Sequence, residues 1–279
     1  MDYHMVVLDL DGTLTNSEKK VTERTKKALT DYMEHGGTVV LASGRPTYGI
    51  IPLARELHLD TYGGYILSFN GGQIISCEKN EVIYQKELPS GVPKLLGEKA
   101  KEHDVGILTY EGDHIVTETP ENIYAQKESF INKMPIQKIE DFSSYVNFPV
   151  TKCLMVADGD YLARVEEQLK MELGSRYSIL RSEPYFLEIM PEGIDKAQSL
   201  ERLLAHVGIE RKEMAAFGDG FNDRSMLVYA GLGVAMGNAQ EPVKEAADYI
   251  APTNDEDGVA WVIEHMIMQE EASASNCSM

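Results

Sequence analysis

The chain has 279 residues, of which 26 are Lys or Arg and 45 are Asp or Glu, so its formal net charge is −19. This excess of negative charge disfavours nucleic acid and anionic membranes as partners, because both require a basic surface. No apolar run approaches the roughly 20 residues of a membrane-spanning helix, and the N-terminus has no signal-peptide pattern. The three widely spaced cysteines form no CxxC or zinc-binding pattern, so we expect a cytoplasmic protein with free thiols.

The first third of the chain alternates between strand and helix patterns. The sequence predicts strands at MVVLDL, TVVLAS and YILSFN, with helices over residues 22–35 and 46–58 between them. Thr22 is a suitable N-cap for the first helix, and Gly36 and Gly37 terminate it. Helical segments of about 10–15 residues between strands are typical of a doubly wound α/β fold with a parallel, Rossmann-like sheet.

The middle of the chain has a different texture. From about Glu81 the strands alternate polar and apolar residues, as in EVIYQKEL, VGILTYEG and HIVTETP. An amphipathic helix near 121–133, a strand near 135–140 and a helix over 160–173 follow. Half-polar strands mixed with helices predict an α+β domain with an antiparallel sheet.

After Gly193 the α/β alternation returns, with the helix DKAQSLERLLAHVG, the strand EMAAFGDG and a terminal helix over residues 258–268. The tail QEEASASNCSM is small and polar, and we predict that it is disordered. The sequence therefore predicts an α/β core formed by residues 1–82 and 189–279, with the α+β domain inserted at residues 83–188.

Two aspartates, Asp9 and Asp11, end the first strand in VVLDLDGTLT. Side chains at i and i+2 point to the same side of a strand, and two such carboxylates need a metal, a proton or a ligand between them. A bare DxD pair is common on solvated loops. The apolar strand before it and the GT turn after it instead favour a nucleophilic Asp9 beside an acid/base Asp11, at the strand end where open α/β sheets bind ligands.

The second strand ends in LASGRP. A hydroxyl and backbone N–H groups at a strand end suit an anion, so Ser43 and Gly44 are candidate ligands of phosphoryl oxygens. On its own SGR is typical of a turn. Its position one βαβ step after the DxD turn favours phosphate binding, because neighbouring parallel strands bring their carboxyl ends together. Arg45 would then contact the substrate or brace the loop.

The strand predicted after the inserted domain ends in AFGDGFND. Mg²⁺ prefers hard oxygen ligands in octahedral geometry, which Asp9 and Asp219 can supply as carboxylates and Asp11 through its backbone oxygen. Asn222 is a neutral amide that can donate to a phosphate. Asp223 is expected to hold a metal-bound water or a lysine.

Lys196 begins a helix in EGIDKAQSL, where its charge opposes the helix dipole and an anionic partner would offset that cost. Lone lysines are usually solvated. With DxDGT, ASGR, this lysine and GDGxND in that order, however, the chain resembles the haloacid dehalogenase superfamily, and in particular Cof-type sugar phosphatases with a class IIB cap. The resemblance implies that Asp9 attacks phosphorus, Asp11 protonates the leaving group and Lys196 is the third motif. Asn70, in SFNGG, either lines the substrate pocket or forms a turn.

The resemblance implies a Mg²⁺-dependent phosphomonoesterase that acts on small phosphate esters through an aspartyl-phosphate. Sugar phosphates are the first substrate class, with pyridoxal phosphate or a flavin precursor as alternatives, and Glu111, Arg181 and Tyr185 are the first cap candidates for contacts. A phosphomannomutase-like phosphosugar mutase is the second hypothesis. A non-enzymatic phospho-aspartate switch or binding module is the third, and the second aspartate and the large insertion disfavour it. We expect a monomer, since a mobile cap needs no partner chain.

Overall fold

The computed structural model describes residues 2–268, which divide into two compact units. The core unit comprises residues 2–44, 50–84 and 195–268, and the cap unit comprises Arg45–Gly49 and Gln85–Ile194. The boundaries predicted from the sequence, after residues 82 and 188, lie a few residues before those of the structure. Within residues 2–268, every helix is too short or too polar to cross a lipid bilayer.

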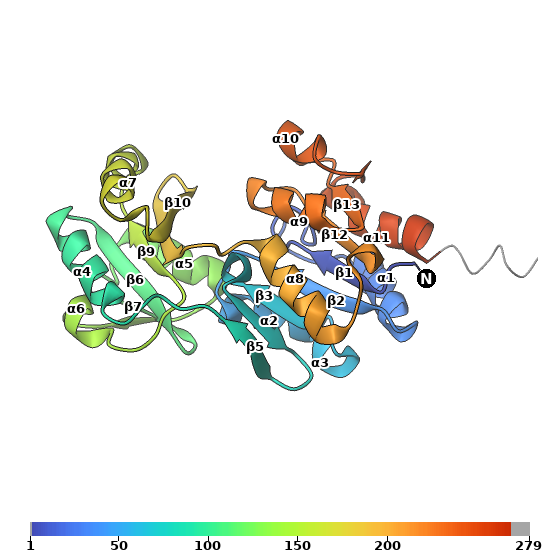
Figure 1. The fold of residues 1–279 in the computed structure, drawn as a ribbon, viewed down its shortest axis with the longest axis horizontal. Coiled ribbons are helices and arrows are strands. Elements are labelled where there is room, and N and C mark those ends of the chain that lie inside the picture. Colours follow the sequence, from blue (N-terminus) through green and yellow to red (C-terminus); the bar gives the residue numbers. More distant parts are fainter. Residues whose placement is uncertain (1, 269–279) are drawn as a thin grey trace, which may run out of the picture. The chain divides into compact units, whose positions relative to one another are not determined.

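An eight-stranded mixed sheet runs through the core unit in the order β14-β13-β12-β1-β2-β3-β4-β5 (Figure 1). The strands from β14 to β3 pair in parallel, and β4 is antiparallel to β3. The central strand β1 (Met5–Leu8) is buried at every position, as expected for a sheet covered on both faces. The other strands are β2 (Thr38–Ala42), β3 (Tyr65–Ser68), β4 (Gln73–Ser76), β5 (Glu81–Gln85), β12 (Met214–Gly218), β13 (Leu232–Ala235) and β14 (Tyr249–Ile250).

Helices cover both faces of this sheet (Figure 1). On one face, Val6 and Leu8 pack with α1 (Glu23–Glu34), α2 (Thr47–Glu56) and α11 (Gly258–Val262). On the other, Met5 and Val7 pack with α8 (Lys196–Val207), α9 (Arg224–Tyr229) and α10 (Glu241–Lys244). The core unit also contains α3 (Leu59–Tyr62), the 3₁₀ turns Phe69–Gly71, Arg211–Glu213, Phe221–Asp223 and Asn254–Glu256, and a π-helical turn at Ile263–Ile267. The alternation of apolar side chains along β1 thus sends one set to each helical layer, which is the doubly wound arrangement that the sequence predicts.

A six-stranded sheet in the order β10-β11-β9-β6-β7-β8 forms the cap unit. All neighbouring strands are antiparallel except β7 and β8. Its strands are β6 (Gly106–Glu111), β7 (His114–Thr117), β8 (Ile136–Lys138), β9 (Cys153–Val156), β10 (Tyr177–Glu183) and β11 (Phe186–Pro191). The helices α4 (Val92–Glu102), α6 (Phe142–Tyr145) and α7 (Gly159–Leu173) pack on one face, and α5 (Ile123–Asn132) packs on the other.

Several elements differ from the sequence-based expectation. The segment Glu81–Gln85 is a strand, as predicted, but it forms the edge strand β5 of the core sheet beside β4 and not a strand of the inserted domain's sheet. The helix α4 was not predicted, because it starts at an uncapped Gly91–Val92–Pro93 turn without the usual Ser, Thr, Asp or Asn signal. The predicted terminal helix changes from α-helical to π-helical hydrogen bonding at Ile263. The tail predicted to be disordered lies outside the described residues.

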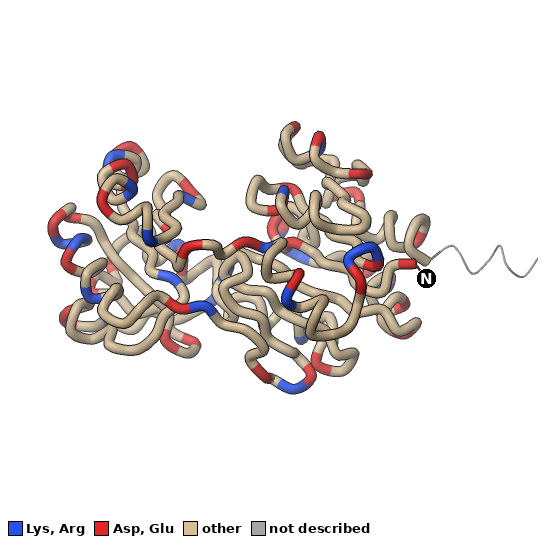
Figure 2. Tube along the Cα trace, in the orientation of Figure 1, with Lys and Arg blue, Asp and Glu red and all other residues tan. Residues whose placement is uncertain are grey.

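Acidic and basic residues are interspersed along the chain in both units (Figure 2). Many of them form ion pairs between exposed neighbours, such as Lys27 with Asp31 and Lys20 with Glu18. Exposed pairs of this kind contribute little to stability, about 0–1 kcal/mol each. The ion pairs that matter for function are the buried ones described below.

Candidate active site

The carboxyl ends of β1, β2 and β12 lie side by side because these strands are in register. Leu8 pairs with Leu41 on one side and with Phe217 on the other. Asp9 follows β1 directly, Ser43 follows β2, and Asp219 follows β12. The parallel sheet therefore gathers three of the predicted motifs at one edge, as expected for a ligand site of an open α/β sheet.

Lys196 is a fully buried cation at the centre of this site. Its Nζ donates to Asp9 Oδ1 at 2.8 Å, to Asp223 Oδ1 at 2.6 Å and to the carbonyl oxygen of Ala42 at 2.9 Å. The lysine is the first residue of α8, and the side chain of Asp195 caps that helix by accepting from two backbone N–H groups. The cap fixes where the helix begins, and the three acceptors satisfy all three ammonium protons.

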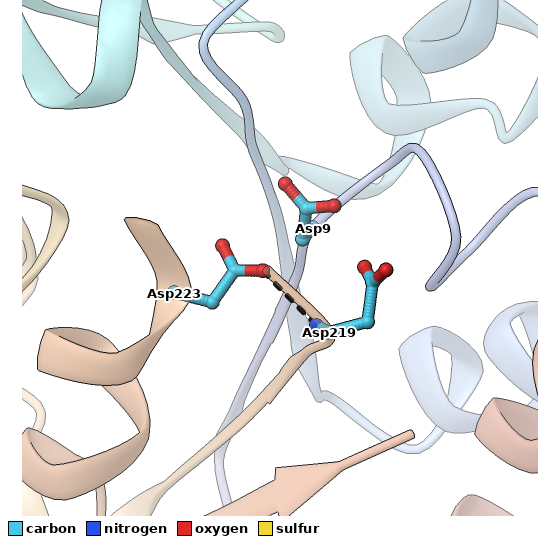
Figure 3. A group of neighbouring side chains, drawn as sticks. All are labelled: Asp9, Asp219 and Asp223. Carbon is cyan, nitrogen blue, oxygen red and sulfur yellow. Dashed lines mark hydrogen bonds between the residues drawn. The ribbon is translucent and has the colours of Figure 1, made fainter. Parts of the chain in front are cut away.

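The carboxylates of Asp219 and Asp223 accept hydrogen bonds from different donors, and the backbone N–H of Asp219 is one of the donors to Asp223 (Figure 3). The Thr13 hydroxyl donates to Asp219 Oδ1 at 2.8 Å. Asp223 Oδ2 accepts from the backbone N–H groups of Asp219 at 3.0 Å and Gly220 at 2.9 Å. With Lys196 on its other oxygen, Asp223 has both carboxylate oxygens engaged, so it positions the lysine and the 219–220 turn.

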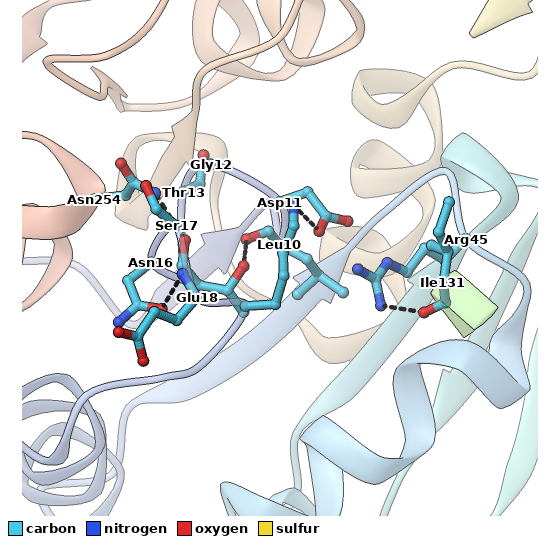
Figure 4. A network of polar contacts seen from close by, with 12 residues as sticks. Leu10, Asp11, Gly12, Thr13, Asn16, Ser17, Glu18, Arg45, Ile131 and Asn254 are labelled. Atoms are coloured by element: carbon cyan, nitrogen blue, oxygen red, sulfur yellow. Dashed lines mark hydrogen bonds and ion pairs between the residues drawn. The ribbon is translucent and has the colours of Figure 1, made fainter. Parts of the chain in front are cut away.

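Asp11 lies at the start of a tight loop after β1, where it is half-exposed and forms an ion pair with Lys19 at 2.9 Å. Asn16 organises the loop by accepting, through Oδ1, from the N–H groups of Glu18 and Lys20 (Figure 4). Lys19 has a φ of 60°, in the left-handed region that ordinary residues avoid. This lysine could not be predicted, because nothing in NSEKK distinguishes it from a solvated side chain.

Ser43, Gly44 and Asn70 form a second polar group beside β2 and β3. Ser43 is buried, and its backbone carbonyl accepts from the N–H of Asn70 at 2.9 Å. A β-carbon on Gly44 would lie 3.1 Å from Asn70 Nδ2, so glycine lets the loop pass close to that amide. Asn70 has a φ of 55° and accepts from Asn222 Nδ2 at 3.1 Å. The amides of Asn70 and Asn222, which lie far apart in the sequence, are therefore joined at this edge.

The other predicted contact residues lie in the cap unit. Arg45 belongs to it and donates to the carbonyl oxygen of Ile131 at 3.5 Å (Figure 4). Glu111 accepts from the Tyr145 hydroxyl at 2.8 Å, and Arg181 pairs with Glu166 at 2.7 Å. The Tyr185 ring stacks on Tyr124 at 5.1 Å. Each of these side chains has a partner within the cap unit, and their contact with substrate stays a prediction.

Burial and repulsion between neighbouring carboxylates raise the pKa values of Asp9 and Asp219. Burial, followed by the proximity of Asp223, raises the pKa of Asp9 to about 8 against the opposing effect of Lys196. Burial likewise raises the pKa of Asp219 to about 6, although the Thr13 hydrogen bond lowers it. Burial lowers the pKa of Lys196, but Asp223 and Asp9 outweigh it and raise that pKa above its ordinary value. One ammonium thus faces three carboxylates, and the site is short of positive charge.

A divalent cation fits this deficit. Asp9, Asp219 and Asp223 each place one carboxylate oxygen within 4.8 Å of the others. Since both oxygens of Asp223 already accept hydrogen bonds, the residues suited to coordinate a cation are Asp9 and Asp219, with Asp223 behind them. Carboxylate oxygens are the ligands that hard cations such as Mg²⁺ prefer.

Besides Lys19, the structure adds two residues that the sequence patterns did not single out, Thr13 and Asn238. Thr13 fixes the orientation of Asp219, and Asn238 donates to the carbonyl oxygen of Gly12 at 2.8 Å, which holds the turn after the two aspartates. Thr13 is part of the DGT motif, so the sequence alone could have identified it as a site residue. Asn238 follows β13 in a generic MGN turn, which carries no such signal.

Comparison with known proteins agrees with this geometry. Residues 6–263 match the family model of haloacid dehalogenase-like hydrolases. The crystal structure of a haloacid dehalogenase-like hydrolase from Bacteroides thetaiotaomicron has a TM-score of 0.91 at 54% sequence identity, covering 94% of this chain and 98% of that one. The subclass IIB sugar phosphatase BT4131 has a TM-score of 0.77 at 28% identity, covering 94% of this chain and 98% of that one.

A relative found by sequence points the same way. The 5-amino-6-(5-phospho-D-ribitylamino)uracil phosphatase YcsE of Bacillus subtilis (strain 168) is 30% identical over 269 residues, which is 96% of this chain and 97% of that protein. The fold expected from the resemblance, an α/β core with an inserted cap, is confirmed by the neighbouring structures. With a family match over nearly its whole length, the chain belongs to the haloacid dehalogenase-like hydrolases and is an enzyme of their Cof-type phosphatase group.

Proposed function

We propose that this enzyme is a Mg²⁺-dependent phosphomonoesterase that hydrolyses small phosphorylated metabolites, with sugar and sugar-alcohol phosphates as the first class. The observation that carries the proposal is the buried contact of Lys196 with Asp9 and Asp223 at the strand ends. A lysine buried between two carboxylates orients Asp9 and supplies positive charge where a phosphoryl group would bind. The names of two relatives, a sugar phosphatase and a phosphatase of a ribityl phosphate, support the substrate class.

In the proposed mechanism Asp9 attacks phosphorus in line and forms an aspartyl-phosphate. Asp11 donates a proton to the departing alkoxide and then accepts one from the water that hydrolyses the intermediate. Bound at Asp9, Asp219 and the Asp11 carbonyl, Mg²⁺ would supply electrostatic stabilisation of the phosphoryl oxygens. Lys196 holds Asp9 through its 2.8 Å hydrogen bond and adds a fixed positive charge.

The remaining core residues have positioning roles in this proposal. Asp223 keeps Lys196 in place, and Thr13 orients the Asp219 carboxylate. Ser43, Gly44 and Asn222 would contact phosphoryl oxygens. Uncatalysed hydrolysis of phosphate monoesters is so slow that the acceleration approaches ~10²¹-fold, which requires many preorganised groups acting together.

The test is phosphate release from a panel of esters with Mg²⁺ and with EDTA, for wild type and Asp9→Asn. Asp104→Asn is the matched control, because Asp104 is exposed and its φ of 49° is one that asparagine tolerates well. We expect Mg²⁺-dependent release that is lost in Asp9→Asn and kept in Asp104→Asn. Release that persists in Asp9→Asn would refute the aspartyl-phosphate mechanism.

The same assay separates the phosphatase from a phosphosugar mutase. A mutase transfers the phosphoryl group to a second sugar hydroxyl and depends on a bisphosphate activator. We expect free phosphate to appear at the rate at which the ester disappears, without any bisphosphate. Isomerised sugar phosphate in place of free phosphate would instead establish the mutase.

A further inference from the structure

The two aspartates of the proposed mechanism are held in different ways. Asp9 is held by a buried cation, since 10% of its side chain is exposed and Lys196 Nζ donates to it at 2.8 Å. Asp11 has 36% of its side chain exposed and pairs with Lys19 on the surface. The position of Asp11 therefore depends mainly on the loop that carries it, residues 10–20, which we call the acid loop.

Thr15 links Asp11 to the far side of the acid loop. Its N–H donates to the carbonyl oxygen of Leu10 at 2.9 Å, and that carbonyl belongs to the peptide that leads into Asp11. Thr15 and Asp11 also pair as a single β-bridge, and the side chain of Thr15 is buried. A contact that fixes Thr15 therefore also fixes the backbone at Asp11.

Two residues from the C-terminal part of the chain hold the acid loop, and we call them the loop clamp: Asn254 and Asp255. Asn254 lies beside the acid loop, and its Nδ2 donates to the carbonyl oxygen of Thr15 at 2.9 Å (Figure 4). Asp255 accepts from the backbone N–H of Ser17 at 2.8 Å and from its hydroxyl at 2.6 Å. The loop clamp thus contacts the acid loop on both sides of Asn16, which organises its turn.

The parallel sheet brings the loop clamp to the acid loop. The strands β14, β13, β12 and β1 pair in parallel, so their carboxyl ends lie along the same side of the sheet. The 3₁₀ turn that contains the loop clamp follows β14. Asn238, which follows β13, accepts from the N–H of Asn254 at 3.0 Å and donates to the carbonyl oxygen of Gly12 at 2.8 Å. The loop clamp is therefore built on the ends of core strands and is tied to the turn after Asp11.

We propose that Asn254 and Asp255 are positioning residues for the transfer of a proton from Asp11 to the leaving alcohol. This inference rests on the proposed phosphatase function and deepens it. In that step an Asp9 oxygen forms its bond to phosphorus while the bond from phosphorus to the ester oxygen breaks, and the proton of the Asp11 carboxyl goes to that ester oxygen. The acid must lie within hydrogen-bond distance of the atom that it protonates, so release of the acid loop from the loop clamp should slow the transfer. Asp9 keeps its hydrogen bond from Lys196 and can still attack.

The chemistry of the leaving group separates this role from a purely structural one. An alkoxide is a strong base and needs the proton, whereas 4-nitrophenolate is a stable anion that leaves without one. Misplacement of Asp11 should therefore slow the hydrolysis of a sugar phosphate more than that of 4-nitrophenyl phosphate. A general disturbance of the site would slow the hydrolysis of both esters alike.

The experiment measures kcat/KM at saturating Mg²⁺ for 4-nitrophenyl phosphate and for one sugar phosphate. The sugar phosphate is the one that wild type hydrolyses fastest among glucose 6-phosphate, ribose 5-phosphate and sorbitol 6-phosphate. For this mechanism kcat/KM covers the steps up to release of the alcohol, so the later hydrolysis of the aspartyl-phosphate does not enter it.

The clamp variants are Asn254→Ala and Asp255→Ala, and Asp248→Ala is the matched control. The carboxylate of Asp248 also accepts from a backbone N–H, that of Gly233 at 2.8 Å. This contact lies between β13 and β14 as well, but toward their amino ends, away from the acid loop.

We expect the ratio of kcat/KM for the sugar phosphate to kcat/KM for 4-nitrophenyl phosphate to fall by at least about tenfold in each clamp variant, since a well-placed acid contributes about 10²–10⁴-fold. Asp248→Ala should keep the wild-type ratio. When Asn254→Ala is added to Asp11→Asn, the ratio should not change further, because no acid is left to position.

Equal losses on the two esters, or an unchanged ratio in both clamp variants, would overturn the inference. A further fall in the ratio when Asn254→Ala is added to Asp11→Asn would overturn it as well. Asp255 is exposed, so Asp255→Ala decides the question if Asn254→Ala does not fold. Wild type that releases phosphate from no ester would instead refute the proposed function, so the two failures are distinguishable.

Discussion

A β-carbon on Gly12 would lie 2.4 Å from Oδ2 of Asp219. The next residue, Thr13, donates a hydrogen bond to Oδ1 of the same aspartate, which lies 206 positions further along the chain. The turn after the first strand therefore packs directly against the carboxylate that ends β12. Gly12 has a φ of 89°, which disfavours any side chain there. The glycine of DGT is thus required by a close approach to Asp219 as well as by the turn.

The first prediction is that Gly12→Ala displaces Asp219 and weakens Mg²⁺ binding. Gly36→Ala is the matched control: its φ is 87°, and nothing within residues 2–268 lies within 4 Å of the added β-carbon. Both variants lose about 1–2 kcal/mol of stability from the left-handed backbone. Only Gly12→Ala should raise the Mg²⁺ concentration for half-maximal activity, by about tenfold. Equal Mg²⁺ dependence in the two variants would show that Asp219 is not a metal ligand.

The second prediction concerns Lys196→Met, which leaves Asp9 and Asp223 buried beside each other without their shared cation. Removing one member of a buried ion pair costs about 3–5 kcal/mol, so we expect a loss of that size in the free energy of unfolding by urea. Activity should fall by at least about 100-fold. Lys212→Met is the control, since Lys212 pairs with Glu210 on the surface with 75% of its side chain exposed. Stability within about 1 kcal/mol of wild type would contradict the buried charge of Lys196.

Much of this site was predictable from sequence because its residues end strands. In β1, β2 and β12 an apolar run stops at Asp9, Ser43 and Asp219, and parallel pairing then brings these ends together. Arg45 illustrates the limit. It follows the predicted phosphate-binding loop in sequence, yet it belongs to the cap unit and donates to the carbonyl oxygen of Ile131.

The buried ion pair between Lys152 and Glu188 in the cap unit was not predictable, for a physical reason. Glu188 lies in the strand FLEIMP, where the sequence shows a lone glutamate within an apolar run and gives no sign of a partner for its charge. Its burial depends on Lys152, which lies 36 positions away, and on coverage of that face of the sheet. Sequence patterns report the period of a strand, but the partner of a buried charge is set by tertiary contacts. The same applies to Lys19, whose ion pair with Asp11 needs the left-handed turn of the loop.

The third prediction is a pH dependence of stability without metal. Asp9 has a folded-state pKa of about 8, raised from 3.8 by burial and then by Asp223. Between these values the folded state binds more protons than the unfolded state, so stability is greatest at low pH and falls as pH rises toward 8. One proton contributes at most about 1.4 kcal/mol per pH unit. Asp219, with its pKa raised to about 6, acts in the same direction at lower pH.

Unfolding free energies in EDTA at pH 5, 6.5 and 8 test this for wild type and Asp9→Asn. We expect the wild type to lose stability across this range and Asp9→Asn to lose less, since asparagine does not titrate. Saturating Mg²⁺ should remove most of the difference between pH 5 and pH 8, because the cation favours the ionised carboxylate. Identical pH profiles for the two proteins in EDTA would show that the pKa of Asp9 is not raised.

The fourth prediction isolates the hydroxyl of Thr13. Thr13→Val keeps the side-chain shape and removes the 2.8 Å hydrogen bond to Asp219 Oδ1. A group that orients a metal-binding carboxylate usually contributes about 10–100-fold to metal affinity, so we expect the Mg²⁺ concentration for half-maximal activity to rise by about tenfold.

Thr15→Val is the matched control: Thr15 is buried in the same loop, but its hydroxyl donates to the carbonyl oxygen of Leu10 at 2.9 Å. Both variants lose one buried hydrogen bond, about 1 kcal/mol of stability, whereas only Thr13→Val should change the Mg²⁺ titration of phosphate release. If the two titrations coincide, the hydroxyl of Thr13 supports the loop alone and Asp219 needs no help to bind the cation.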